Sequence, residues 1–457
     1  MKHHEHEPDR PGGRRVGSRW WAVGLAGVSC LALTTVGASV ASAADANERS
    51  LTTTGDQPPT EGYHGKRDDR GKGTDDRKGQ KEKEPEGVPV PCDADSLIAA
   101  ITFANARGGA VLDLAKNCTY LLTANIDGNG LPAITAPITL NGSKHTIIER
   151  AAAVEQFRII AVDPGGDLTL QKLTITGGQT TNAGTDGAGI FVNVGGALTT
   201  NHSTVTRNIA GGSGGGIANN GNTQLNNSTV NRNTSNSSGG GVSSIGVLGI
   251  SKSHIDFNNA SLGGGIVSSG TSQIEGSSIS GNRVQGAIGG YFINSGTSLI
   301  ANSEVTNNVA AGSIGGIFVN VSTQVTLQSV TLAGNVASSG LAGGLGTDAN
   351  SSVVIEDSVV KNNNSSNQGG AIFNSAGMVL RGTKVTGNQA NLGGGIYNGG
   401  GGTLTLFATA VVENIAITDG GGIFNAGGTV ELNTATGTVV VKNRPNNCSG
   451  AVPGCPG

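Results

Sequence analysis

The chain has 457 residues and a formal net charge of −3 at pH 7, so no strong electrostatic field points to nucleic acid or to an anionic membrane as a partner. Glycine supplies 77 residues without a Gly-X-Y period, which excludes a collagen helix. Valine, isoleucine and leucine recur at regular places, which excludes a chain that is disordered throughout.

Residues 1–43 have the three parts of a secretory signal peptide. Trp20 to Val40 is apolar, and Ala41-Ser42-Ala43 fits the small-residue cleavage site. The basic part before them contains Arg10, Arg14, Arg15 and Arg19. We expect cleavage after Ala43, with an uncleaved membrane anchor as the alternative, and the arginine pair leaves the Sec and twin-arginine routes both open. The mature protein is then expected to be secreted, either extracellular or associated with the cell wall, and not inserted in a membrane.

Residues 44–91 form a stretch rich in charge, Gly and Pro, with almost no large apolar side chains. Such a composition cannot bury a core, so we predict a disordered linker. Residues 92–457, in contrast, carry few charges, and Asn, Ser, Thr and Gly supply their polarity. A surface of this kind suits polar neutral ligands such as glycans.

Residues 92–186 are expected to hold an N-terminal cap and the first coils of a solenoid. The segment from Asp95 to Ala106 has the pattern of a short amphipathic helix with an N-cap. Irregular strands follow it, up to Ile175. A helix in this place would cover the open end of the solenoid and protect it from edge-to-edge pairing.

Residues 187–443 contain a repeated pattern that resembles Gly-Gly-Gly-Ile-Phe-Asn. The repeats follow one another at intervals of 24 to 28 residues, a period typical of solenoids. The aliphatic or aromatic position of this pattern is occupied by Ile190, Ile217, Val242, Ile266, Phe292, Ile317, Leu345, Ile372, Ile396 and Ile423.

A second column shares this period. In each repeat an Asn stands three residues after a Val, Ile or Leu. These residues are Asn208, Asn233, Asn258, Asn282, Asn308, Asn335, Asn363, Asn388, Asn414 and Asn443. Asn tolerates left-handed backbone, and stacked Asn side chains can bond from coil to coil, so we interpret the column as a structural ladder. Metal or sugar binding is the alternative interpretation.

Between these columns, Val, Ile and Thr alternate with polar residues at period two, as in Gly402 to Phe407. The pattern predicts an all-β, right-handed, single-stranded parallel β-helix with coils about 4.8 Å apart. Residues 444–457 are expected to form its C-terminal cap.

Aromatic residues directly follow the column residue in several repeats, so they are expected to point outward as a patchy stripe. Of these, Phe373, Tyr397 and Phe424 are the candidates for ligand binding. Stacking on sugars is the functional interpretation, and packing under a loop or against the next coil is the alternative.

Four cysteines remain after cleavage of the signal: Cys92, Cys118, Cys448 and Cys455. In an exported protein they indicate disulfides, and three pairings are possible. Because the two clusters lie a whole solenoid apart, we favour one bond in each cap, Cys92 with Cys118 and Cys448 with Cys455. A zinc site is the alternative interpretation, but no His lies near these cysteines in the sequence, and no metal site is predicted.

The segment Ser96-Leu-Ile-Ala-Ala-Ile with Ala104-Asn105-Ala106 resembles the start of pectin-lyase-like β-helix proteins. The repeats Gly369-Gly-Ala-Ile-Phe-Asn374 and Val385-Thr-Gly-Asn388 are similar to the GGAI and FxxN repeats of polymorphic outer membrane proteins, which are surface adhesins. The resemblance covers residues 92 to about 445 and implies a β-helix. It implies little about activity, since the repeated residues are the structural ones.

The charged residues offer few candidates for catalysis. Glu275 and Glu356 fall in one column, but three coils apart, roughly 14 Å, which is too far for a pair of glycosidase carboxylates. A polysaccharide lyase would need a base and a cation such as calcium. The best candidate residues are Glu356, Asp357, Arg381 and Lys384. Since Glu356 and Arg381 occupy one column on adjacent coils, they should touch, and a surface salt bridge is the alternative interpretation.

These observations favour a non-catalytic extracellular protein, adhesin-like or glycan-binding. A polysaccharide lyase or glycoside hydrolase is the alternative, and only that alternative would involve calcium. The expected partner is a polysaccharide or a cell-surface glycan, bound by a monomer. Arg207 and Arg232 also stack in one column, where they could hold an anionic polymer or be solvated turn residues.

Overall fold

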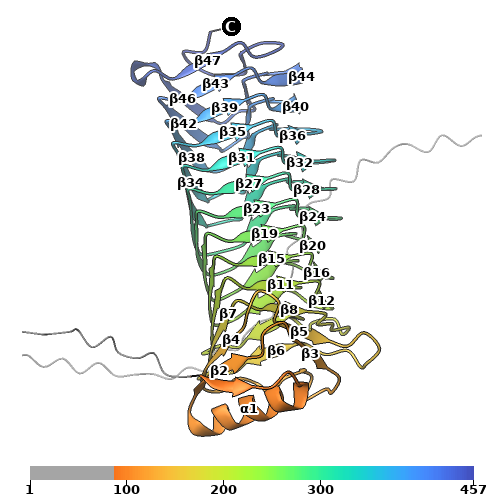
Figure 1. The fold of residues 1–457 in the computed structure, drawn as a ribbon. Coiled ribbons are helices and arrows are strands. Elements are labelled where there is room, and N and C mark those ends of the chain that lie inside the picture. The colour runs from red at the N-terminus through yellow and green to blue at the C-terminus, as the bar shows by residue number, and fades with distance from the viewer. Residues whose placement is uncertain (1–86, 457) are drawn as a thin grey trace, which may run out of the picture. The chain divides into compact units, whose positions relative to one another are not determined.

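The computed structural model describes residues 87–456, which form a parallel β-helix preceded by one helix (Figure 1). The chain winds so that each coil adds one strand to each of up to four parallel sheets, named here sheets 1 to 4 in the order in which a coil visits them. The predicted all-β parallel β-helix is therefore confirmed. The predicted signal peptide and nearly all of the predicted linker lie outside the described residues.

Sheet 1 is the longest of the four, with 14 strands that are mostly five residues long. Its first strand begins at Val88, before the expected start of the folded part at Cys92. In spatial order the strands are β1 (Val88–Val90), β2 (Ala110–Leu114), β4 (Pro137–Asn141), β7 (Asp167–Gln171), β10 (Ala197–Asn201), β14 (Asn222–Asn226), β18 (Val247–Ser251), β22 (Thr271–Glu275), β26 (Thr297–Ala301), β30 (Gln324–Gln328), β34 (Ser352–Glu356), β38 (Gly377–Arg381), β42 (Thr403–Phe407) and β46 (Thr429–Asn433).

Sheet 2 follows sheet 1 in each coil and has 13 strands. They are β3 (Thr119–Leu122), β5 (Ile147–Arg150), β8 (Thr174–Thr176), β11 (Thr204–Thr206), β15 (Thr229–Asn231), β19 (His254–Asp256), β23 (Ser278–Ser280), β27 (Glu304–Thr306), β31 (Thr331–Ala333), β35 (Val359–Lys361), β39 (Lys384–Thr386), β43 (Ala410–Val412) and β47 (Val439–Val441).

Sheet 3 has nine strands, most of two residues, and starts only in the regular coils. They are β12 (Ile209–Ala210), β16 (Thr234–Ser235), β20 (Asn259–Ala260), β24 (Arg283–Val284), β28 (Val309–Ala310), β32 (Val336–Ala337), β36 (Asn364–Ser365), β40 (Gln389–Leu392) and β44 (Ile415–Asp419). Sheet 4 closes each coil with β6 (Ile160–Val162), β9 (Ile190–Val192), β13 (Ile217–Asn219), β17 (Val242–Ser244), β21 (Ile266–Ser268), β25 (Tyr291–Ile293), β29 (Ile317–Val319), β33 (Leu345–Thr347), β37 (Ile372–Asn374), β41 (Ile396–Asn398), β45 (Ile423–Asn425) and β48 (Cys448–Ser449).

The period-two alternation of the sequence explains the core. In the regular strands of sheet 1 from β10 to β42 the second and fourth residues point inward and are buried, as Leu404 and Leu406 are in β42. The first, third and fifth residues face outward. Stacked coils therefore turn each inward position into a continuous column of buried side chains.

One residue of the predicted column is assigned wrongly. In β25, Tyr291 pairs with Ile266 and Ile317 and is fully buried, whereas Phe292 faces outward. The pair of glycines before the strand sets the register, and Tyr291 follows Gly289-Gly290 directly. The inward tyrosine is accommodated because its hydroxyl lies 2.8 Å and 2.6 Å from the hydroxyls of Ser268 and Ser272.

The asparagine column lies at the corner between sheets 2 and 3 and is buried along its length. Each side chain bonds both to its own neighbour in the column and to the main chain. For example, the Asn258 amide group donates to Asn282 Oδ1 at 3.1 Å and to the Val230 carbonyl at 2.9 Å. The Asn258 Oδ1 atom in turn accepts from the main-chain N–H of Asn233 at 3.0 Å. This geometry leaves the amides no room for a sugar or a metal.

A further polar column, not predicted from the sequence, lies at the corner between sheets 1 and 2. Here the main-chain N–H of one coil donates to a serine hydroxyl of the next, as Ser228 does to Ser253 at 3.0 Å. The Ser253 hydroxyl donates to the Ser251 carbonyl at 2.8 Å. The pattern is visible in the sequence, since a Ser or Thr precedes most strands of sheet 2 at the same offset.

Both ends of the solenoid are covered. Helix α1 (Ala94–Arg107) lies across the first coil, with Leu97, Ile101 and Ala104 buried against it (Figure 1). The Asp93 side chain caps the helix by accepting from the Ser96 N–H at 2.8 Å. At the other end the last coil contains the exposed short helix η1 (Thr434–Thr436) and is followed by β48, after which Val452 and Cys455 pack against the core. Disulfides join Cys92 to Cys118 and Cys448 to Cys455, the pairing favoured by the sequence.

Candidate functional site

The outer face of sheet 1 offers the widest regular surface on which outward side chains repeat coil after coil. In its middle coils these side chains are mostly amides and hydroxyls, such as Asn222, Gln224 and Asn226 on β14, and Thr271 and Gln273 on β22. Amide and hydroxyl groups both donate and accept hydrogen bonds. The face therefore presents many hydrogen-bonding groups and little charge.

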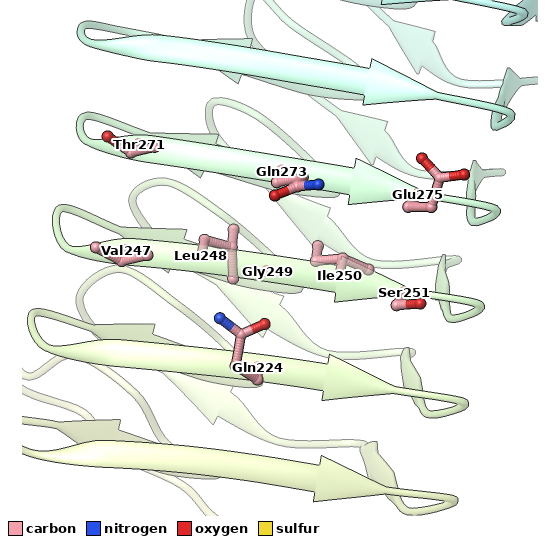
Figure 2. Close-up of a pocket in the computed structure, with 9 residues that line it drawn as sticks. All are labelled: Gln224, Val247, Leu248, Gly249, Ile250, Ser251, Thr271, Gln273 and Glu275. Atoms are coloured by element: carbon pink, nitrogen blue, oxygen red, sulfur yellow. The ribbon is translucent and has the colours of Figure 1, made fainter. Parts of the chain in front are cut away.

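A depression of about 330 Å³ lies on this face around Gly249 (Figure 2). Gln224 on the preceding strand and Gln273 on the following strand occupy the same column, so Gly249 leaves a gap between two amide side chains. A side chain at Gly249 would collide with the Gln224 amide, which leans over the gap. The lining consists of Gln224, Val247, Leu248, Gly249, Ile250, Ser251, Thr271, Gln273 and Glu275.

A second depression of about 320 Å³ adjoins the first and shares Thr271 and Gln273 with it. Its other lining residues are Ser272, Thr297, Ser298, Leu299, Gln324 and Thr326. The two depressions together extend from β14 to β30 along the solenoid. Glu275 supplies the one carboxylate of their linings, and it accepts a hydrogen bond of 2.7 Å from the Asn302 amide.

The charged cluster predicted from the sequence lies farther along the same face. Arg381 on β38 pairs in register with Glu356 on β34, and its Nη1 atom lies 3.2 Å from Glu356 Oε1. Both side chains are solvent-accessible, with relative exposures of 57% for Arg381 and 30% for Glu356. The Arg381 guanidinium also lies 5.6 Å from the Phe407 ring centre on the next coil. A pair this exposed contributes about 0–1 kcal/mol to stability.

Asp357 and Lys384 do not join this pair. Asp357 occupies the corner after β34 with a φ of 47°, and Lys384 is the first residue of β39 in sheet 2. Within residues 87–456 neither forms an ion pair. The cluster is therefore one salt bridge with two charged residues nearby.

The carboxylates of sheet 1 are widely spaced. Glu275 and Glu356 share one column, with Ala301 and Gln328 between them, so they stand three coils or about 14 Å apart. Glycosidase carboxylate pairs require about 5 to 9.5 Å. Across residues 87–456, no group of three or more His, Cys, Asp or Glu side chains is arranged to hold a metal ion.

The structure brings the three aromatic candidates together on the outer face of sheet 4. Phe373 stacks on Tyr397 with ring centres 5.4 Å apart, and Tyr397 stacks on Phe424 at 5.3 Å. The interplanar angles are 10° and 9°, so both faces of Tyr397 and the inner faces of Phe373 and Phe424 are covered by neighbouring rings. Partial burial raises the pKa of Tyr397. Because a sugar stacks on a ring face, this arrangement suits packing between coils better than sugar binding.

Sequence reasoning missed the depression at Gly249. Its signal is the alternation Gln224, Gly249, Gln273 at one position of three successive strands, which becomes visible only when the register is known. None of the described helices is long and apolar enough to cross a membrane.

No protein-family model matches the chain, and no curated protein matches it either. Among solved structures, the chain is similar to the A-module of the mannuronan C-5 epimerase AlgE6 of Azotobacter vinelandii, with a TM-score of 0.36 and 14% identity over 75% of this chain and 99% of that one. It is also similar to PfbA, a surface adhesin of Streptococcus pneumoniae, with a TM-score of 0.31 and 12% identity over 76% of this chain and 93% of that one.

The tailspike protein 3 of bacteriophage CBA120 is a third similar structure, with a TM-score of 0.29 and 13% identity. The match covers 77% of this chain and 59% of the tailspike. At these scores the likenesses carry no argument about a site, and the candidate site rests on the chain's own geometry.

Proposed function

We propose that the protein is a secreted, adhesin-like β-helix that binds a neutral, hydroxyl-rich glycan on the outer face of sheet 1 without cleaving it. The observation that carries this proposal is the pair of adjoining depressions lined by amides and hydroxyls. Each has a volume within the range of about 300–1,000 Å³ that is usual for small-ligand sites.

The chemistry of the lining supports a neutral ligand. Gln224 and Gln273 can each donate and accept, as sugar hydroxyls do, and the flanking Thr271 adds a hydroxyl. The Glu275 carboxylate accepts a hydrogen bond from the neutral Asn302 amide and keeps its negative charge, which disfavours an anionic ligand. Leu299 in the second depression offers an apolar contact for a sugar ring.

The spacing of charged groups supports binding rather than cleavage. Hydrolysis would need two carboxylates on one bond, and Glu275 and Glu356 lie three coils apart. The Arg381 guanidinium is engaged by Glu356. Lys384 stands on sheet 2, beyond the corner that separates it from the depressions.

The test is a binding assay with a panel of neutral and acidic polysaccharides. The variant Gly249→Leu places a side chain in the first depression and forces the flexible Gln224 amide to move aside. The column accommodates a leucine two coils on, at Leu299. We expect Gly249→Leu and the double variant Gln224→Ala/Gln273→Ala to weaken retention on a neutral polysaccharide about tenfold, a loss of about 1.4 kcal/mol. Gln328→Ala, on the same face but outside both linings, is the matched control and should bind normally.

The same incubations report catalysis if new reducing or unsaturated chain ends are measured. New ends that disappear in Glu356→Ala or Arg381→Ala would replace this proposal by the lyase or hydrolase alternative. Normal binding by Gly249→Leu would move the glycan site away from the depressions.

A further inference from the structure

The two corners that flank sheet 2 carry a distinctive set of residues in the early coils. Both corners require positive φ. In the corner before the strand, the residues are Lys172, His202, Asn227 and Lys252, with φ between 47° and 52°. In the corner after the strand, they are Arg207, Arg232 and Phe257, with φ of 54° to 55°.

The later coils fill the same corners differently. The first corner is occupied by Gly276, Asn302, Ser329, Asp357, Gly382 and Ala408, and the second by Gly281, Asn307, Gly334, Asn362, Gly387, Glu413 and Lys442, so Gly and Asn are the commonest residues but not the only ones. Gly and Asn are the residues that adopt left-handed backbone most readily. The early coils thus place large cationic side chains where the backbone itself favours Gly or Asn, and such locally strained positions often serve a function.

These cations are free to meet a ligand. Lys172, Arg207, Arg232 and Lys252 are all exposed. Throughout the described residues the ion pairs are His254 with Asp256 and Arg381 with Glu356, so none of the four has an anionic partner. Arg207 and Arg232 stand on adjacent coils, about 4.8 Å apart along the solenoid axis.

Hydroxyl groups fill the surface between the two corners. Thr204 on β11 is partly exposed, whereas Thr206 is buried with 7% of its surface accessible, although Val205 between them points into the core. Thr174 and Thr176 on β8 pair with them in register, and Thr229 on β15 continues the first column. The result is a column of three partly exposed threonines, Thr174, Thr204 and Thr229, over three coils. Lys172 stands at the corner before these strands, and Arg207 and Arg232 stand at the corner after them.

An acidic residue lies at each end of this surface along the solenoid axis. Glu149 pairs in register with Thr176 at the start, and Asp256 follows Asn231 at the end. The Asp256 carboxylate accepts from Ser280 at 2.8 Å and lies 3.9 Å from His254 Nδ1. The part of sheet 2 between these two acids consists of β8, β11 and β15. We name it, together with its corner cations, the threonine surface.

We propose that the threonine surface binds a linear anionic polysaccharide that lies along the solenoid axis. Carboxylate or sulfate groups on successive sugars would meet Arg207 and Arg232, whose planar guanidinium groups can bind such oxygens in a bidentate manner. The threonine hydroxyls match the hydroxyls of the sugar rings. A single-stranded nucleic acid is a poorer fit, since β8, β11 and β15 carry no aromatic side chain on which a base could stack.

The test uses the double variant Arg207→Asn/Arg232→Asn. Asn307 and Asn362 occupy the same corner in other coils, so this variant keeps the backbone and should melt at the same or a higher temperature. Binding of the purified chain to dextran sulfate, to alginate and to uncharged dextran is measured at low and physiological salt. We expect binding to at least one charged polymer but not to dextran, and a loss of about tenfold in the variant.

The matched control is Lys361→Thr/Lys384→Thr, which removes two positive charges from sheet 2 where Thr331 and Thr386 occupy the same columns. It should bind normally, as should Gly249→Leu, because the depressions of sheet 1 are a separate site. If the lysine control lost as much binding to the charged polymer as the arginine variant, net charge alone would explain the loss, and the proposal would be overturned. Unchanged binding by the arginine variant, or stronger arginine-dependent binding of a thymidine oligonucleotide, would overturn it as well.

Discussion

The first coils, up to residue 186, and the regular coils, from residue 187 to residue 443, meet one requirement by different means. Wherever the chain turns a corner, buried main-chain groups lose their partners in the sheets and need other hydrogen bonds. In the regular coils the asparagine ladder supplies them, with one side chain in each coil. The Asn258 amide, for example, serves the Val230 carbonyl and the next asparagine.

In the first coils, where sheet 3 is missing, two arginines take this role. The Arg158 guanidinium donates to the carbonyls of Asp186 and Gly187 at 2.7 Å and 2.8 Å, and stacks 4.7 Å from the Phe191 ring. Burial lowers its pKa to about 10. Arg150 donates likewise to the Gly177 carbonyl at 2.8 Å.

The difference follows from reach. An asparagine side chain reaches one coil, so a ladder works only when successive coils follow the same path through the corner. An arginine carries five donors on a long stem and can serve carbonyls that irregular loops place at different heights. Repetition therefore allows one short residue type to serve every regular corner, whereas each irregular corner needs its own long side chain.

Removing one asparagine from the middle of the ladder should have the largest effect. Asn258→Ala leaves the Asn233 N–H and the Val230 carbonyl buried without these partners, so we expect a loss of about 3 kcal/mol in the free energy of unfolding. Asn443→Ala, at the last rung, should cost less because it interrupts the ladder at its end. Urea denaturation measures both, and equal losses would show that the rungs act independently.

Replacing the partly buried Arg158 should destabilise the protein less than Asn258→Ala does, and the effect should be more local. Arg158→Met keeps the packing on Phe191 but leaves the carbonyls of Asp186 and Gly187 without its N–H donors, so we expect a loss of about 2 kcal/mol. Because solenoid coils contact only their neighbours, protease cleavage should increase between residues 178 and 187 first. Arg158→Lys keeps the charge without the fork of donors, and full rescue by lysine would contradict this account of reach.

The same contrast decides how much of the fold was predictable. The asparagine and aliphatic columns repeat, so the sequence alone indicates the coils and the contact between Glu356 and Arg381. The register fails at Phe292, because the pattern was aligned on large apolar residues and two of them, Tyr291 and Phe292, stand side by side. The glycine pair before the strand carries the true register there.

Features without a period were beyond such reasoning. Arg150 and Arg158 occur once each, and nothing in their neighbourhood marks them as partners of main-chain carbonyls. The depression at Gly249 depends on a missing side chain and on the direction in which Gln224 leans, which only coordinates provide. The site was therefore less predictable than the fold, since a binding surface lies where the repeat is interrupted.

In the C-terminal cap a carboxylate, rather than an asparagine or an arginine, makes the hydrogen bonds at the corner. Replacing this carboxylate should cause the smallest loss of stability. Asp419 accepts from the Ser449 hydroxyl at 2.6 Å and from the Asn446 amide at 2.7 Å, and these bonds hold its pKa below the ordinary value. A lowered carboxyl pKa means that the stabilisation is complete above the unfolded pKa of about 3.9 and is lost as the pH falls through the folded pKa.

At pH 7, Asp419→Asn should therefore be less stable than the unmodified chain by about 1 kcal/mol. The difference should shrink as the pH falls below about 4, because protonation weakens the carboxylate of the unmodified chain while the asparagine does not titrate. Thermal melts of both proteins between pH 7 and pH 2 measure this convergence. A difference that stayed constant to pH 2 would mean that the charge of Asp419 does not hold the cap, and that its shape alone, as in the asparagine ladder, is sufficient.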